Sequence, residues 1–177
     1  MKNKKINIHF LGAAGTVTGS KYLVDTGDRK ILIDCGLFQG LKELRLKNWE
    51  YPPVNVGDID AVLLTHGHMD HTGYLPRLVK QGFNGPIYGT NPTLDIAKII
   101  LNDSAKIQEQ EAERANKEKY SKHQPALPFY TIEDAARTIR MLAPAEKDVW
   151  HSLSENCKYR FRYNGHIIGA TFIELAL

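Results

Sequence analysis

An α/β fold is predicted by three features of this sequence: short β-rich runs in its first third, a long helical pattern in its middle, and two more β-rich runs at its end. The early runs are INIHF (6–10), YLVD (22–25) and KILID (30–34), and the TGD between the last two fits a hairpin turn. A fourth run, AVLLT (61–65), is short and apolar, as expected of a buried strand.

Helical spacing dominates the middle of the chain. Apolar residues recur every three or four positions over 74–79, with Gly82 placed as a C-terminal stop, and NGPIYGT (84–90) predicts a turn followed by a strand. The longest helix is expected to begin with Asn91 as its cap and Pro92 in its first position. The residues expected on one face of this helix are Ile96, Ile100, Ser104 and Ile107.

The second half of this long helix carries alternating charges. Its continuation over 108–123 is typical of a solvated helical face, and QPALPFY (124–130) interrupts it. Another helix is expected at Thr131, with Asp134 three positions on in a capping-box-like arrangement. The chain ends in KYRFRYNGHIIGATFIELAL (158–177), which predicts two β-rich runs joined by an NGH turn.

The bulk composition is that of an ordinary soluble domain. The 177 residues are 42% hydrophobic and 24% charged, with a net charge of +3, which suits one domain or part of a larger protein. Cys35 and Cys157 match no metal or redox spacing, so they form one disulfide or remain buried free thiols in a reducing cytosol, and the second is favoured. Neither a signal peptide nor a membrane-spanning run is recognised, which predicts a cytoplasmic protein with no membrane partner.

The motif THGHMDH (65–71) contains three of the seven histidines and directly follows the expected buried strand. In an extended segment, alternate side chains share a side, so His66, His68 and Asp70 can converge while His71 turns to a neighbouring position. Imidazole and carboxylate groups are ligands of Zn²⁺ and similar ions, and four of them can serve a pair of metals. The alternative is a polar loop with incidental histidines, or a helix N-terminus capped by Asp70. The density of ligands favours a metal site.

This motif also carries a family resemblance. THGHMDHTGYLP resembles the His-x-His-x-Asp-His signature of the metallo-β-lactamase fold, with Asp34 in ILIDCG and His166 in NGHIIGA matching its strand-end aspartate and its lone downstream histidine. Four further segments are similar to the β-CASP nucleases, which include ribonuclease J and the endonuclease of pre-messenger RNA 3′-end cleavage. These segments are LGAAGTVTGSKYLV, LFQG, YGTNPTLDIAKIILNDSAKIQEQEA and GHIIGATFIEL.

The resemblance implies two divalent metal ions, Zn²⁺ or Mn²⁺. One ion would be bound by the histidines His66, His68 and His166, and the second by Asp70 and His71. Asp34 and Asp70 are the expected catalytic carboxylates, and Asp34 would act by accepting a hydrogen bond from a ligand. Without the family, a strand-end turn would be the preferred role of Asp34. The histidines expected to be structural are His9, His123 and His151.

The glycine-rich segment GAAGTVTGSK (12–21) is a separate candidate for phosphate binding. It lacks the lysine-before-serine order and the following helix of a Walker loop, because Ser20 precedes Lys21 and a strand follows. Its glycines are therefore expected to permit a tight turn near the metal site rather than to bind a nucleotide.

The resemblance implies a metallo-β-lactamase-like αββα sandwich, of which residues 1–177 form an N-terminal part, incomplete at its C-terminus and without the β-CASP insertion. The expected function is metal-dependent cleavage of RNA phosphodiesters, with single-stranded RNA as partner, in the complete protein. The 177 residues alone are expected to be inactive and to form a homodimer through the apolar strand near 172–177. The alternatives are a non-catalytic metal-binding or self-associating fragment, or a hydrolase of thioester, lactone or lactam substrates.

Overall fold

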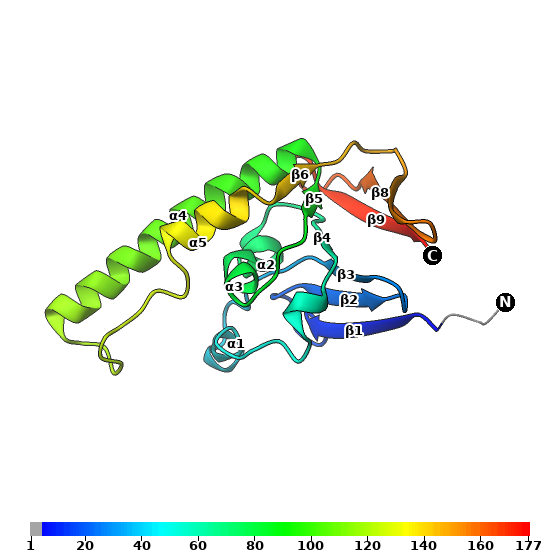
Figure 1. Cartoon of the computed structure of the whole chain (residues 1–177). Coiled ribbons are helices and arrows are strands. Elements are labelled where there is room, and N and C mark those ends of the chain that lie inside the picture. Colours follow the sequence, from blue (N-terminus) through cyan, green and yellow to red (C-terminus); the bar gives the residue numbers. More distant parts are fainter. Residues whose placement is uncertain (1–4) are drawn as a thin grey trace.

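The computed structural model describes residues 5–177, so the basic start of the chain, residues 1–4, lies outside the described part (Figure 1). One sheet has six strands in the order β1-β2-β3-β4-β5-β6, antiparallel from β1 to β3 and parallel from β3 to β6. Its strands are β1 (Asn7–Gly12), β2 (Lys21–Asp25), β3 (Lys30–Ile33), β4 (Ala61–Leu63), β5 (Ile87–Gly89) and β6 (Leu142–Pro144).

A second, antiparallel sheet has the order β7-β8-β9. Its strands are β7 (His151–Ser154), β8 (Cys157–Tyr163) and β9 (Thr171–Ala176). Side chains of both sheets form one apolar cluster, in which Ile31 and Leu63 of the first sheet meet Tyr159 and Phe161 of the second. The two sheets therefore pack against each other through this cluster.

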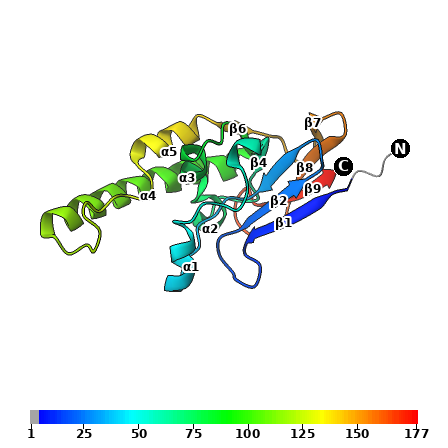
Figure 2. The same ribbon diagram turned by 60° about the horizontal axis from the view of Figure 1, so that its bottom comes forward.

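Helices cover the other face of the first sheet (Figures 1 and 2). The larger apolar cluster joins strand residues such as Val62 and Ile87 to Leu75, Leu78 and Leu101 of the helices. The helices are α1 (Lys42–Lys47), α2 (Met69–Thr72), α3 (Leu75–Lys80), α4 (Asn91–Glu118) and α5 (Ile132–Ile139), with a 3₁₀ turn at Val56–Asp58.

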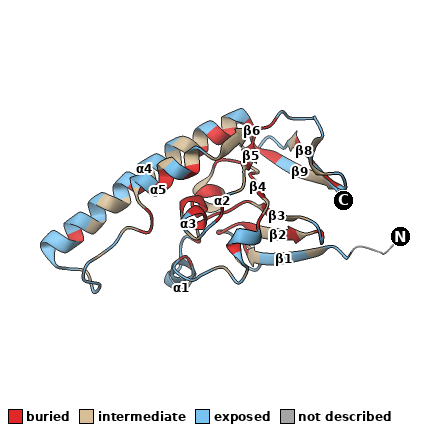
Figure 3. Cartoon of the chain, viewed as in Figure 1, coloured by how far each residue is buried: buried red, intermediate tan, exposed pale blue. Residues whose placement is uncertain are grey.

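The layers are thus helices, sheet, sheet, which confirms the expected α/β fold and the metallo-β-lactamase-like arrangement. Among residues 5–177 no helix covers the outer face of the second sheet. Buried residues concentrate in the strands and short helices around the middle of the molecule, whereas the far half of α4 is largely exposed (Figure 3). No helix in the described part is both long and apolar enough to cross a membrane.

The long helix differs from its prediction in two respects. Its N-cap is Thr90 rather than Asn91: the carbonyl of Thr90 accepts from the N–H of Leu94, and the Thr90 side chain makes no capping hydrogen bond. Its buried face includes Leu94, Ala97, Leu101 and Ala105. Of the residues that were expected to share the buried face, Ile96, Ile100 and Ser104 are only half-buried, and Ile107 is 47% exposed.

The other helix start was predicted correctly: Thr131 and Asp134 form a complete capping box at α5. Both cysteines are buried free thiols, as expected. The elements that the sequence analysis missed are α1, the 3₁₀ turn, α2, β6 and β7, all of which are short.

Candidate metal centre

The predicted ligands lie at one edge of the first sheet, where β4 ends. Leu64 and Thr65 continue from the strand, and His66 to His68 form the loop that leads into α2. The prediction that the motif is extended throughout is wrong. The chain enters α2 at Met69, so Asp70 and His71 lie on that short helix. Gly67 permits the close approach of α4 to this loop: a Cβ there would lie 2.5 Å from Cγ2 of Ile96 on α4.

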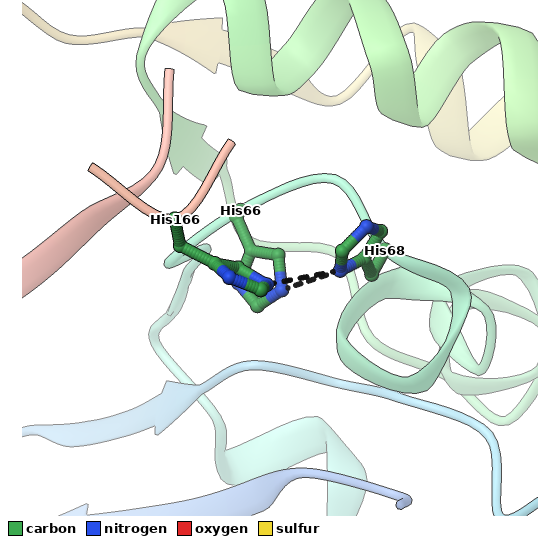
Figure 4. A group of neighbouring side chains, drawn as sticks. All are labelled: His66, His68 and His166. Atoms are coloured by element: carbon green, nitrogen blue, oxygen red, sulfur yellow. Dashed lines mark hydrogen bonds between the residues drawn. The ribbon is translucent and has the colours of Figure 1, made fainter. Parts of the chain in front are cut away.

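Three histidine side chains converge at this edge (Figure 4). Nε2 of His66 lies 3.0 Å from Nδ1 of His68, and Nε2 of His166 lies 3.3 Å from the same atom. All three ligand atoms lie within 4.8 Å of one another, although His166 is almost one hundred positions away in sequence. His66 is buried, His68 half-buried and His166 exposed, so the group opens to solvent.

The two spacings to His68 are compatible with ligands of one tetrahedral ion. Nitrogen ligands at about 2.0–2.1 Å from Zn²⁺ would lie roughly 3.3 Å apart, close to the two nitrogen–nitrogen distances to His68. Thr65 Oγ1 lies 2.9 Å from Nδ1 of His66 and donates to Asp34, so it is free to accept from the Nδ1–H group. With the proton on Nδ1, the Nε2 lone pair of His66 is directed toward His68 and is available to a metal ion.

The Asp34 carboxylate organises the buried side of the centre and is only 2% exposed. Its Oδ1 accepts from the backbone N–H of Thr65 at 2.8 Å, and its Oδ2 accepts from Ser20 Oγ at 3.1 Å. Oδ2 also lies 2.7 Å from Nδ1 of His71. Asp34 is therefore placed to orient His71, whereas it forms no hydrogen bond with any of the three converging histidines.

Asp70 and His71 form the second pair of predicted ligands. His71 donates its Nδ1–H to Asp34, which leaves Nε2 available 3.7 Å from Oδ2 of Asp70. Burial acts to lower the pKa of His71, but the hydrogen bond and charge of Asp34, with the charge of Asp70, outweigh it and raise that pKa. Burial, followed by the charge of His71, lowers the pKa of His66 to about 4. At neutral pH His66 is therefore uncharged and able to act as a ligand.

The loop that carries His166 is anchored to the rest of the molecule at its C-terminal end. Hydroxyl groups of Thr90 and Thr93, at the start of α4, both donate to the carbonyl of Gly169 at 2.8 and 2.9 Å. The N–H of Thr171, the first residue of β9, donates to the carbonyl of Thr65 at 2.8 Å. The first turn of α4 and the strand-end residue Thr65 thus hold His166 near the other histidines.

Sequence reasoning missed the roles of Thr65, Ser20 and the two threonines of α4. Thr65 is the first residue of the THGHMDH motif, and Ser20 precedes the last residue of the glycine-rich segment, so hydroxyl residues within these two motifs were the available signal. The histidines expected to be structural lie away from the group: His9 is exposed in β1, His123 lies in the loop before α5, and His151 packs on the Tyr159 ring.

A mixed sheet backed by helices, a second sheet and a histidine group at the strand end define the class of protein. The chain belongs to the metallo-beta-lactamase superfamily, whose family profile matches residues 14–154. The fold is also similar to that of the metallo-beta-lactamase fold protein YhfI from Bacillus subtilis. That similarity has a TM-score of 0.52 at 18% identity and covers 96% of this chain and 56% of that one.

Two relatives narrow the class further. Ribonuclease TTHA0252 of Thermus thermophilus is 35% identical over 92% of this chain and 33% of its own length. Transcription termination factor FttA of Methanocaldococcus jannaschii is 31% identical over 96% of this chain and 25% of its own length. The resemblance to the RNA-processing nucleases of the β-CASP group is thereby confirmed. The chain spans about a third or less of the length of these relatives.

Proposed function

We propose that this chain supplies most of the metal ligands of a hydrolase that cleaves RNA phosphodiester bonds. The convergence of His66, His68 and His166 at an open edge of the sheet carries the proposal, because a metal-binding group reachable from solvent is what such a reaction requires. The ribonuclease and termination-factor relatives favour RNA as substrate over thioesters, lactones or lactams.

The geometry suggests which residues would bind each ion and which would position a ligand. His66, His68 and His166 would hold one divalent ion, and Asp70 with His71 would contribute two ligands to a second. Bound ions would polarise a phosphoryl oxygen and lower the pKa of a water molecule. Asp34 would keep the His71 ring in place and fix its tautomer. We propose zinc as the ion, with manganese as the alternative, and the cytoplasm as the location of the protein.

The test is RNA cleavage by a polypeptide that contains this chain together with the remaining length seen in its relatives. A single-stranded RNA would be incubated with the wild-type protein, with and without chelator, and with His68→Ala and His151→Ala variants. We expect cleavage only by the wild type without chelator and by the His151→Ala control. Equal cleavage in all samples would refute the proposal.

The 177 residues by themselves are expected to be nearly inactive, because Asp70 and His71 are too few protein ligands for a tight second site. Measuring zinc stoichiometry by titration tests this point. One tightly bound ion per chain, removed by His166→Ala, is the expected result. Two tightly bound ions together with RNA cleavage would contradict it.

Self-association through β9 is the remaining part of the proposal. Within residues 5–177, β9 pairs with β8 on one side only and has no strand on its other side. Phe172 and Leu177 are 48% and 47% exposed, so the unpaired edge also presents apolar surface. Sedimentation of the wild type and of a Phe172→Lys variant would test this. We expect a dimer that the substitution dissociates, and a monomeric wild type would refute it.

A further inference from the structure

A cavity of about 300 Å³ lies beside the glycine-rich segment, apart from the histidine group. It is lined by the turn after β1, the N-terminal end of β2, the segment after α1, and the side chains of Phe38 and Tyr74. Its polar side chains include two lysines, Lys21 and Lys47, and one acid, Glu50. None of its lining residues is among the predicted metal ligands.

Lys21 is the most unusual side chain in this cavity, because it is a lysine that is only 6% exposed. Its ammonium group donates to the carbonyl of Gly36 at 2.5 Å. The same group lies over two aromatic rings, 4.6 Å from the centroid of Phe38 and 4.8 Å from that of Tyr74. Burial lowers the pKa of Lys21, which shows the cost of placing its charge here.

No carboxylate neutralises this ammonium within the part of the chain that the structure describes. Lys21 forms no ion pair with an acidic side chain there, and the single backbone hydrogen bond occupies one of its three N–H groups. Glu50 is exposed, and its backbone carbonyl accepts from the Tyr74 hydroxyl. A buried charge that lacks a counter-ion is unfavourable, and an anionic ligand in the cavity would remove that cost.

The other lining side chains are of the kinds that bind the phosphate and the base of a nucleotide. Lys47 is exposed at the end of α1, with its ammonium 5.9 Å from the Phe38 centroid, so the two lysines flank one ring. Phe10 and Tyr51 offer aromatic surface that is 66% and 76% exposed. Exposed aromatic rings stack on nucleobases, and lysines bind phosphate as point charges.

We propose that this cavity binds the phosphate group of a nucleotide through Lys21 and Lys47, with Phe10 and Tyr51 available to stack on its base. The lysine at the end of the glycine-rich segment, rather than the backbone of the segment, would hold the phosphate. The nucleotide is either free or part of an RNA strand.

The cavity lies close to the candidate metal centre, because Gly36 contacts both Lys21 and Asp70. A Cβ at Gly36 would lie 1.5 Å from the carbonyl oxygen of Asp70, so the residue that accepts from Lys21 packs directly against α2, which carries Asp70 and His71. An RNA strand bound in the cavity would therefore be held next to the histidine group. This placement deepens the proposed nuclease function, whereas the phosphate site itself is independent of it.

The test is nucleotide binding in the presence of EDTA, so that neither metal binding nor cleavage contributes. Calorimetric titration of the 177-residue chain would compare AMP, adenosine and a five-nucleotide oligoadenylate. We expect AMP to bind with a Kd on the order of 1 mM or tighter, at least about tenfold more tightly than adenosine. Tighter binding of the oligomer than of AMP would identify RNA as the ligand, and equal binding a free nucleotide.

Two variants and a control locate the binding. Lys47→Glu and Lys21→Met should each weaken AMP binding at least about tenfold, while Lys106→Glu, an exposed lysine of α4, should leave it unchanged. Because Lys47 is exposed, its variant is expected to fold even if Lys21→Met does not. Equal affinity for AMP and adenosine, or unchanged AMP binding by Lys47→Glu, would overturn the proposal. A failed nuclease assay would leave this result unaffected.

Discussion

At the scale of single residues, Asp34 is notable for its backbone conformation as well as for its side chain. Asp34 has a positive φ of 57°, an uncommon conformation for a residue with a side chain. The four hydrogen-bonding groups around its carboxylate, from Ser20, Thr65 and His71, offset the cost of that backbone conformation and of its burial. Loss of this carboxylate would release His71 and Thr65 together.

Gly169 gives a test at the residue scale. Its φ is +79°, and a Cβ there would lie 2.7 Å from the backbone nitrogen of Thr93 and 2.8 Å from Cβ of Pro92. Gly169→Ala should therefore lower the free energy of unfolding by about 2–5 kcal/mol and weaken zinc binding through His166. Urea unfolding and a zinc titration would measure both effects.

Gly165 is the matched control for this substitution. It has a similar φ of +78° but nothing within 4 Å of the added Cβ. Gly165→Ala should cost only the backbone strain, about 1–2 kcal/mol, and leave the packing against α4 unchanged. Equal losses for the two variants would show that the contact with α4 does not position the loop.

At the scale of elements, the capping box of α5 predicts a pH-dependent stability. Burial acts to raise the pKa of Asp134, but the N–H of Thr131 and the nearby Lys80 outweigh it and lower that pKa. The stabilisation is therefore present above the unfolded pKa near 3.9 and is lost as pH falls through the lower folded value. Asp134→Asn should cost about 1 kcal/mol at pH 7 and much less near pH 3.

Urea unfolding of this variant at both pH values provides the measurement. Glu133→Gln is the control, because Glu133 is exposed and its nearest cation, Arg137, lies 3.9 Å away. We expect this neighbouring substitution to change stability little at either pH. A loss for Asp134→Asn that does not depend on pH would rule out the charge of Asp134 as the cause.

The long helix predicts a contrast between two of its apolar residues. Leu101 is fully buried against the sheet and α5, whereas Ile107, which the sequence pattern placed on the contact face, is 47% exposed. Leu101→Ala should cost about 2–5 kcal/mol, and Ile107→Ala less than about 1 kcal/mol. Comparable losses in urea unfolding would mean that the helix is rotated relative to the structure.

At the scale of the whole molecule, the centre joins the two sheets. His66 and His68 follow a strand of the first sheet, whereas His166 lies between two strands of the second. An ion held by all three would bind only the folded chain, so zinc at about 100 times its Kd should stabilise the fold by about 2.7 kcal/mol. For a chain of this size the Tm should rise by about 5–10 °C.

Thermal unfolding with and without zinc would check this value. His166→Ala should abolish most of the increase, while His151→Ala, in the same sheet but outside the group, should retain it. An equal increase in both variants would place the zinc elsewhere on the protein.

The sequence by itself determined the local parts of this protein. Short β-rich or apolar runs predicted β1 to β5, and the Thr131–Asp134 pair predicted the start of α5. The density of possible ligands at His66, His68, Asp70 and His71 predicted a metal site. Such signals are readable because each depends on neighbours within a few positions, whose geometry the backbone dictates.

Only the tertiary structure decided what depends on distant segments. It brought His166 to His68 across 98 positions, placed the Lys21 ammonium over two aromatic rings with no carboxylate paired to it, and turned Leu101 rather than Ile107 toward the core. These outcomes follow from packing between α4, the strand ends and the second sheet. No local pattern encodes them, because the free energy of burial is shared among residues that meet only in the folded chain.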